Sequence, residues 1–495
     1  MTYRQILRST GITGTSQVIV YAISILRVKF VAVLLGPEGV GLVGLYNSTV
    51  DLVANLSSMG INQSGVRAIA STGGDKTSLS YNTTVITIYR LSIILGLSGT
   101  ILTASLSTLL SNSIFGNAEH ATAIQFLSFA VFLNVISGAF LATLQGNQRI
   151  FTLAKVNIIG AAITTFATII LYSLLGPKGI VPVILSAAMI AAATSAICAR
   201  DQMPSQQHVN WRTTAEDGIT LLKFGTSLIY GTILSIIAGL IIRATITHRL
   251  GLDSNGIYLA ACGVSGLFSS FIVSAIAVDF YPRLSRAIGD HDQLNRLVSE
   301  QIEMGLLLAT PGLIATCMLA HNLIALFYSE SFTAAEALIP WLVAGSLLQI
   351  FFFPIGYLQR AKASSRWVFI SQTEANFGLV LFSVLLIDKF GLMGAGYALV
   401  IHMIVHGLTI MVIADRLTRF RPSLGVLKVT LGAGFLFTGA LILQATLSGT
   451  MYIITSLAIM TATSAWTLRG VASKVLNEQD TIVRNFPILK YLLLS

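Results

Sequence analysis

The sequence predicts an all-α integral membrane protein with about 14 transmembrane helices, twelve of them arranged as two parallel six-helix repeats. Three observations support this fold class: the composition, a series of long apolar runs and an internal repeat. Hydrophobic residues make up 54% of the 495 residues, charged residues make up only 10%, and the mean hydropathy is +0.80. Soluble proteins carry about 25% charged residues. The composition therefore excludes a water-soluble enzyme and a disordered chain.

The apolar runs are long enough to cross a membrane, because a bilayer core of about 30 Å requires about 20 apolar residues per helix. Fourteen such runs are predicted, near residues 10–35, 40–63, 83–110, 122–145, 154–175, 180–199, 219–247, 256–280, 302–327, 337–358, 368–387, 393–414, 427–446 and 451–468. The first run follows Arg4 and Arg8 but is too long for a signal peptide and has no small-residue cleavage site after it. It is therefore predicted to remain as an uncleaved first helix.

The distribution of Lys and Arg predicts the orientation. If the N-terminus is cytoplasmic, the inner segments hold 23 of the 30 Lys and Arg residues and the outer segments hold three. The remaining four lie inside predicted spans: Arg27, Lys29, Arg90 and Arg243. Cytoplasmic loops carry the excess of basic residues in membrane proteins. Both termini are therefore expected in the cytoplasm, and the net charge of +10 is expected to mark that side and an anion site rather than a nucleic-acid surface.

The chain also repeats itself. LLGPEGVGL at 34–42 pairs with RLGLDSNGI at 249–257, LLGPKGIVP at 174–182 pairs with KFGLMGAGY at 389–397, and LQGNQR at 144–149 pairs with LQRAKA at 358–363. The first two pairs are 215 residues apart and the third is 214 apart. Because each copy holds an even number of spans, both copies enter the membrane from the same side.

The repeat predicts three parts. They are an N-lobe at 1–205 with spans one to six, a C-lobe at 206–422 with spans seven to twelve, and an extra helix pair with a cytoplasmic tail at 423–495. Two six-helix lobes with a site between them are typical of a transporter. The extra pair lies outside the repeat, so it is expected to be dispensable for the folding of the lobes.

Other motifs indicate little chemistry. STGGDKTS at 71–78 lacks the spacing of a phosphate-binding loop. His402 and His406 lie one turn apart on the twelfth span without an H-E-x-x-H frame, so they are interpreted as packing or cavity histidines rather than zinc ligands. The three cysteines lie far apart in apolar stretches and are expected to be buried thiols. No catalytic residue, metal site or cofactor is therefore predicted.

The intramembrane charges are the most informative signal. A Lys or Arg at the bilayer centre costs roughly 2.5–3.5 kcal/mol, so four of them would cost on the order of 10–14 kcal/mol without water, a partner or an anion. The acidic residues in or near spans are Asp51, Asp279 and Glu374. Snorkelling to the membrane surface is the alternative and suits Arg90 and Asp279, but it fits Arg27 poorly. The charges thus predict a cationic cavity, and phosphate is the anion that a guanidinium fork suits best.

Three segments resemble a known family. ILRVKFVAVLLGPEGVGLVGLY at 25–46, SMGINQSGVRAIA at 58–70 and VDFYPRLSRAIGD at 278–290 are similar to the polysaccharide transporters of the multidrug/oligosaccharidyl-lipid/polysaccharide exporter (MOP) superfamily. Within it they most resemble the translocases of O-antigen and exopolysaccharide repeat units, over roughly residues 5–420. The last two predicted spans depart from the family's twelve-span pattern and are similar to the additional pair of the lipid II flippases.

The resemblance implies a V-shaped, two-lobed flippase in the bacterial inner membrane. Such a protein moves an undecaprenyl-diphosphate-linked oligosaccharide from the cytoplasmic to the periplasmic leaflet by alternating access. The residues expected to bind this substrate are Arg27, Lys29 and Arg243 for the diphosphate and Asp51, Asn47, Gln63 and Asn376 for the sugar, with Arg90 as a further binding candidate. The residues assigned to the gate or the framework are Asp279, Arg283 and Glu374. H+ or Na+ would be the coupling ion, and a polysaccharide polymerase and a chain-length regulator would be the protein partners.

Three alternatives stay open. A lipid II flippase is a close relative with another head group. A cation-coupled drug antiporter shares the architecture but would favour an acidic cavity. A membrane glycan polymerase or ligase would need a sizeable outer loop with acid and base residues, whereas the longest outer connections, near 111–121 and 328–336, are about ten residues long.

Overall fold

The computed structural model describes residues 3–73, 78–204, 209–362, 364–447 and 449–477. These residues are helical or lie in short connections, and they contain no strand. Eleven helical stretches among them are long and apolar enough to cross a membrane. The chain divides into two compact units, one ending at Leu259 and including Leu326–Ser331, the other comprising Ala260–Ala325 and the chain from Phe332 onward.

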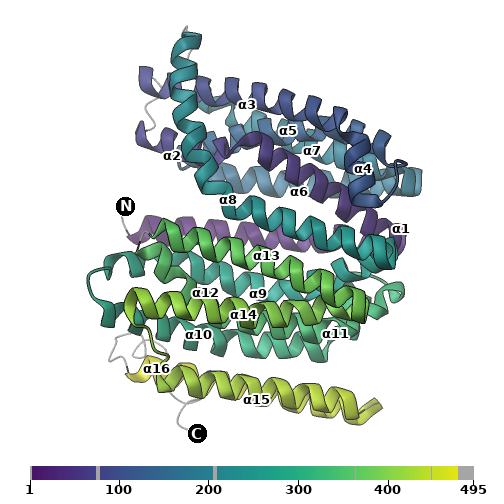
Figure 1. Cartoon of the computed structure of the whole chain (residues 1–495), viewed down its shortest axis with the longest axis vertical. Coiled ribbons are helices and arrows are strands. Elements are labelled where there is room, and N and C mark those ends of the chain that lie inside the picture. Colours follow the sequence, from purple (N-terminus) through teal and green to yellow (C-terminus); the bar gives the residue numbers. More distant parts are fainter. Residues whose placement is uncertain (1–2, 74–77, 205–208, 363, 448, 478–495) are drawn as a thin grey trace. The chain divides into compact units, whose positions relative to one another are not determined.

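The first unit is a bundle of eight α-helices, joined by the start of a ninth. They are α1 (Tyr3–Ser58), α2 (Ile61–Ser71), α3 (Leu79–Ser105), α4 (Ser107–Phe115), α5 (Ala121–Gly146), α6 (Ile150–Leu175), α7 (Ile180–Ala199), α8 (Trp211–Leu250) and the start of α9 (Leu252–Arg286), with short 3-10 turns at Gly176–Gly179 and Arg200–Gln202. Helix α5 packs between α3 and α7, and α6 packs against α7 and α1 (Figure 1).

The second unit contains the rest of α9 and seven further α-helices. They are α10 (His291–Met318), α11 (Ala320–Phe327), α12 (Ile339–Ala361), α13 (Ser365–Phe390), α14 (Met393–Thr418), α15 (Leu424–Thr446) and α16 (Gly449–Asn477), with a 3-10 segment at Glu330–Ala337. Helix α14 packs against α12 and α13, and α10 packs against α12, α15 and α16.

Two of the eleven stretches each hold two crossings. Thr15–Ser58 has 44 residues and Ile150–Gln202 has 53, which at about 1.5 Å per residue is roughly 66 and 80 Å, against a core of about 30 Å. Each is interrupted by a glycine with positive φ, Gly36 or Gly176. Each of the fourteen predicted runs coincides with one or two of the described helices, and the predicted all-α membrane fold is confirmed.

Three predicted runs extend past a break in the helix. The second run continues through Gly60, which has φ 72° and precedes α2. The third and ninth continue through Leu106 and Leu319, where the backbone leaves helical geometry between α3 and α4 and between α10 and α11. The breaks at Leu106 and Leu319 are each made by a single residue inside a largely apolar segment, so average hydropathy does not reveal them.

The backbone confirms the internal repeat. Gly36 has φ 64° and ψ −172°, and Gly251, 215 residues later, has φ 90° and ψ 168°. Gly176 has φ 53° and ψ −138°, and Gly391, again 215 residues later, has φ 58° and ψ −142°. These conformations are essentially restricted to glycine. The two halves therefore turn between helices in the same way at corresponding positions.

The repeated segments cross each other within the first unit at Gly41 and Gly256, which we call the glycine crossing. A Cβ atom on Gly41 would clash with the carbonyl oxygen of Leu252, and one on Gly256 would clash with that of Pro37. Both pairs of partners, 37 with 252 and 41 with 256, are 215 residues apart. The contact thus has the reciprocal form of a two-fold interface. It is completed by the side-chain amide of Asn255, which donates to the carbonyl oxygen of Gly41 at 2.9 Å.

Helix α16 satisfies open carbonyl groups of α10. Pro311 lacks an N–H group and so leaves the carbonyl oxygen of Leu307, four residues earlier, without its helical donor. The Thr467 hydroxyl donates to that oxygen at 2.7 Å, and the Tyr452 hydroxyl donates to the carbonyl oxygen of Met318 at the end of α10 at 2.6 Å. The extra pair is therefore bonded to α10 as part of the second unit.

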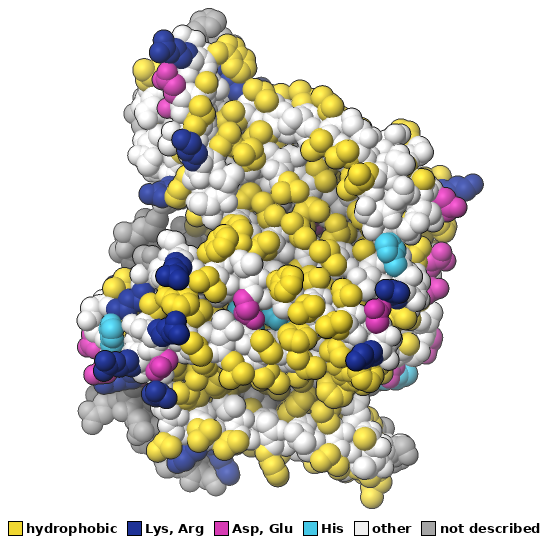
Figure 2. Space-filling view, viewed as in Figure 1, with side chains coloured by type: hydrophobic (Ala, Val, Ile, Leu, Met, Phe, Trp, Pro, Cys, Tyr) yellow, Lys and Arg dark blue, Asp and Glu magenta, His cyan; other side chains and the backbone are white. Residues whose placement is uncertain are grey.

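The surface fits a membrane environment. Large hydrophobic side chains remain exposed along the helices, with Phe435 at 79% and Leu424 at 76% on α15. Over α13 and α14, hydrophobic side chains fill the middle of the face and most charged ones lie toward the helix ends (Figure 2). This distribution, with the long apolar helices, is that of a multi-pass membrane protein.

Candidate substrate-binding site

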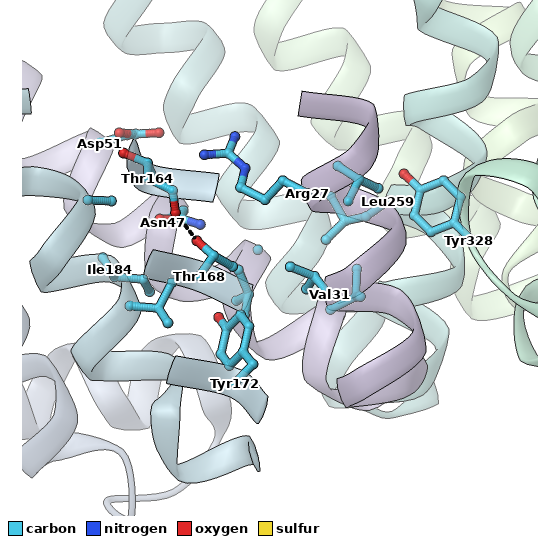
Figure 3. Close-up of a pocket in the computed structure, with 16 residues that line it drawn as sticks. Arg27, Val31, Asn47, Asp51, Thr164, Thr168, Tyr172, Ile184, Leu259 and Tyr328 are labelled. Carbon is cyan, nitrogen blue, oxygen red and sulfur yellow. Dashed lines mark hydrogen bonds between the residues drawn. The ribbon is translucent and has the colours of Figure 1, made fainter. Parts of the chain in front are cut away.

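A cavity of about 510 Å³ lies within the first unit (Figure 3). Both halves of α1 line it, together with α6, α7 and the start of α9. Its polar lining residues are Arg27, Asn47, Asp51, Thr164, Thr168, Tyr172 and Tyr328. The remaining lining is mostly valine and other small apolar side chains, so the polar groups stand in an otherwise apolar wall.

Arg27 supplies the cavity's positive charge. It lies on the first half of α1, is half-buried, and points its guanidinium into the cavity on the side lined by Asp51 and Thr164 (Figure 3). Among the residues that the structure describes, no hydrogen bond or salt bridge engages it. A guanidinium has five N–H donors and no acceptor. The cavity thus offers an anion several donors that no described protein group occupies.

Polar residues at one-turn spacing form the facing walls. Asn47 and Asp51 lie four residues apart on the second half of α1, and Thr164, Thr168 and Tyr172 follow the same spacing on α6. The Thr168 hydroxyl donates to the carbonyl oxygen of Thr164 at 2.7 Å (Figure 3), which leaves its oxygen able to accept from a ligand. The α6 residues were not predicted from the sequence, although the pattern Thr-x3-Thr-x3-Tyr on an apolar helix was a readable signal.

Arg243 lies beside this cavity rather than in its lining. It reaches from α8 to the second half of α1, where its Nη1 atom bonds the hydroxyl of Ser48. Ser48 precedes Asp51 by three residues on the same helix, and Arg243 acts electrostatically on the Asp51 carboxylate. Arg27, which points toward the Asp51 side of the cavity, and Arg243, which acts on the Asp51 carboxylate, are thus both placed near Asp51.

The structure does not bring Lys29 or Gln63 into the cavity. Lys29 follows Arg27 by two residues, which is about 200° around the helix, so it lies on another face of α1. Gln63 is exposed on α2, beyond the break at Gly60. Their predicted role in substrate binding has no support from this cavity.

Arg90 holds the start of α8 instead. Its Nη1 donates to the carbonyl oxygen of Val209 and to the hydroxyl of Thr214, both at 2.9 Å. Its guanidinium also lies 4.4 Å from the ring centre of Trp211. These contacts join α3 to the segment that leads into α8, and they leave Arg90 outside the cavity.

The remaining predicted residues lie in the second unit. Asn376 donates its side-chain amide to the carbonyl oxygen of Gln372 on its own helix at 2.8 Å. Glu374 pairs with His406 at 2.7 Å between α13 and α14. Arg283 is half-buried in the last turn of α9, and the side chain of Asp279 lies outside the described part of the structure.

Comparison with known proteins places the chain in a family. The sequence profile of the family described as polysaccharide biosynthesis protein matches residues 30–337, which is more than half of the chain. The chain belongs to this family. A curated relative of this polysaccharide biosynthesis family protein is the lipid III flippase of Escherichia coli (strain K12), 23% identical over 401 residues, which are 80% of this chain and 94% of the relative.

Solved structures show the same fold. The inward closed form of the lipid II flippase MurJ superposes with a TM-score of 0.67 at 14% identity, covering 94% of this chain and all of that one. An inward-facing multidrug resistance MATE family transporter of the MOP superfamily gives a TM-score of 0.64 at 17% identity, covering 86% of this chain and 96% of that one. These likenesses confirm the fold expected for the MOP superfamily.

Proposed function

We propose that this protein is a flippase for an undecaprenyl-diphosphate-linked oligosaccharide, moving it from the cytoplasmic to the periplasmic leaflet of the inner membrane. The observation that carries the proposal is Arg27, a guanidinium without a described partner, in a cavity lined with hydroxyl and amide groups. The family and the lipid III flippase relative support the lipid-linked glycan as the substrate class.

The cavity offers each part of such a substrate a suitable environment. Arg27 binds the diphosphate through charge-assisted hydrogen bonds, and a guanidinium can grip two oxygens at once. Asn47, Thr168 and Tyr172 can exchange hydrogen bonds with sugar hydroxyls, and Asp51 can accept from them. The polyprenyl tail stays in the bilayer, so its apolar surface never enters water. The protein therefore works by binding and alternating access, as a transporter rather than an enzyme.

The proposed direction of transport depends on the topology. The ratio of 23 inner to three outer Lys and Arg residues supports cytoplasmic N- and C-termini. In a background without the three native cysteines, a cysteine at Lys178 should react with an impermeant maleimide added to intact spheroplasts. A cysteine at Asp201 should react only after lysis. Labelling of the Asp201 position in intact spheroplasts would contradict the proposed orientation and place that segment on the periplasmic side.

Reconstitution tests the function directly. Proteoliposomes would carry undecaprenyl diphosphate linked to a fluorescent oligosaccharide, and an impermeant glycosidase added outside would report the fraction of glycan in the outer leaflet. The wild-type protein should expose the glycan of both leaflets, whereas protein-free liposomes should expose about half of it. The same glycan on an undecaprenyl monophosphate should move more slowly, because half of the anion is missing. Equal exposure with and without protein would refute the proposal.

A lipid II flippase is the second candidate. The MurJ structure aligns with 94% of this chain and along its whole length, so the alignment reaches beyond the two six-span repeats. The same proteoliposomes loaded with labelled lipid II decide between the candidates, because only one head group should be moved at a rate well above that of protein-free liposomes.

A further inference from the structure

A cluster of three titratable side chains lies between α13 and α14, in the second unit. The Nδ1 atom of His406 lies 2.7 Å from Oε2 of Glu374. The His402 ring stacks on the His406 ring with their centres 5.7 Å apart and their planes 16° apart. Figure 2 shows an acidic and a histidine side chain within the hydrophobic surface over these two helices. The cluster places one carboxyl and two imidazole groups at mid-helix in apolar surroundings.

His402 is buried with an open nitrogen. Its exposed fraction is 2%, and its Nδ1 atom has no hydrogen-bond partner in the described structure. Gly378 on α13 leaves the space beside it. A Cβ atom at residue 378 would lie 3.4 Å from Nδ1 of His402 and 3.7 Å from Oε1 of Glu374. The carboxylate therefore has His406 at one oxygen and His402 on the side of the other.

The cluster is electrostatically self-contained. His406 and Glu374 are the charged groups that act on His402. Along α13, the nearest charged residues are Arg366, eight residues or about 12 Å before Glu374, and Asp388, fourteen residues or about 21 Å after it. Along α14, Asp415 follows His406 by nine residues, or about 14 Å.

The other helices that pack against α14 carry their charged side chains away from the cluster of Glu374, His402 and His406. On α12 the charged side chain is Arg360 in the last turn, which lies 5.0 Å from the ring centre of Tyr357. On α10 the charged and titratable residues lie in the first half of the helix, at His291, Asp292, Arg296, Glu300 and Glu303, and Glu303 accepts a hydrogen bond from Ser423 ahead of α15. Any proton that reaches the cluster is thus shared among its own three members.

The geometry suits a proton better than a metal ion. Stacked imidazole rings do not aim their nitrogen lone pairs at one point, as metal ligands must. Within the described ranges, no group of three His, Cys, Asp or Glu side chains could hold a metal ion. Imidazole, in contrast, gains and loses a proton near neutral pH.

We infer that Glu374, His402 and His406 form a proton-binding site that couples the transport cycle to a proton gradient, an inference that rests on the proposed function. Loading forms an N–H bond on one imidazole as hydronium gives up its proton and becomes water. The ionised Glu374 balances the new charge, so the cluster passes from a net charge of −1 to zero. A proton on each imidazole would place like charges on two rings 5.7 Å apart, which disfavours double protonation of the histidine pair.

The charge change gives the coupling a physical basis. A net negative cluster inside a membrane protein favours water and an open environment, whereas a neutral one tolerates a closed apolar environment. Loading and release of the proton thus favour different packings around α13 and α14. One pH unit across the membrane changes the proton occupancy ratio tenfold.

The coupling is tested in the same proteoliposomes with an imposed pH gradient. The wild-type rate should change severalfold, and up to about tenfold, for one pH unit. Glu374→Gln and His406→Gln should show less than about a twofold response. The matched control is His321→Gln, because His321 forms an exposed pair with Glu336 at 2.9 Å outside the cluster. This control should respond like the wild type. A full gradient response in both cluster variants overturns the inference.

A spectroscopic measurement separates the proton site from transport. Infrared difference spectra of purified protein between acidic and neutral pH should contain a carboxyl or imidazole signal that is absent from Glu374→Gln and His406→Gln and present in His321→Gln. Identical spectra for all four proteins would overturn the proton site. If the wild type fails to move any lipid-linked glycan while this signal is present, the proposed function fails and the proton site stands.

Discussion

Replacing Arg27 with glutamine should weaken binding of a diphosphate lipid far more than it affects folding. The guanidinium has no described protein partner to leave unpaired, and glutamine keeps a polar side chain in the cavity. The change therefore removes one charge without stripping a hydrogen bond from the framework. Membrane levels and melting temperature should stay close to those of the wild type.

The magnitude follows from the loss of one charge-assisted contact to an anion. Such a contact contributes roughly 1.5–3 kcal/mol, which corresponds to about a 10- to 150-fold increase in Kd. Because Arg27 is only half-buried, we expect the lower half of that range. Lysine at the same position should recover part of the affinity, because a point charge cannot grip two phosphate oxygens at once.

The assay is titration of undecaprenyl diphosphate into detergent-purified protein, followed by thermophoresis. Lys29→Gln is the matched control, since it removes the same charge two residues away on another face of α1. It should change Kd by less than about threefold. Equal losses for Arg27→Gln and Lys29→Gln would refute the reasoning, because the effect would then come from net charge and not from the cavity.

Three further predictions concern residues outside the cavity. Arg90→Gln should lower the melting temperature and leave diphosphate affinity unchanged, because Arg90 holds the start of α8; weaker binding at unchanged stability would contradict this. Burial lowers the pKa of His120, with Glu119 partly opposing the shift, so the unfolded chain takes up a proton first and stability should decline as the pH falls below about 6.5. His120→Phe, which can keep the stacking on Phe115, should flatten that dependence in thermal melts at different pH. Ending the chain after Arg421 removes the donors to α10, so the truncated protein should melt at a lower temperature, contrary to the expectation that the extra pair is dispensable; an unchanged melting temperature would restore that expectation.

The fold could be predicted because membrane burial imposes simple rules on sequence. Apolar runs of span length follow from the cost of placing polar groups in a bilayer. The turns at Gly36 and Gly251 could be predicted from two similar glycine-containing segments 215 residues apart, since glycine is needed at a positive φ. Local breaks such as Leu106 and Leu319 were not visible, because the run stays largely apolar on both sides of them.

The cavity could be predicted only where it carries charge. Arg27 and Asp51 could be singled out because an ionised side chain within a membrane span is costly and is therefore usually functional. Thr164 and Thr168 were missed because hydroxyl groups can bond their own helix and so cost little in a membrane. Lys29 could not be separated from Arg27, because the sequence does not state which face of a helix meets a neighbour.

The glycine crossing has a consequence for suppressor genetics. A side chain introduced at Gly41 or Gly256 meets backbone carbonyl oxygens, and no substitution at Leu252 or Pro37 removes a backbone atom. A defect caused by Gly256→Val should therefore revert at codon 256 itself, or be bypassed by changes that move whole helices. Intragenic revertants at the contacting residues should be missing from such a collection.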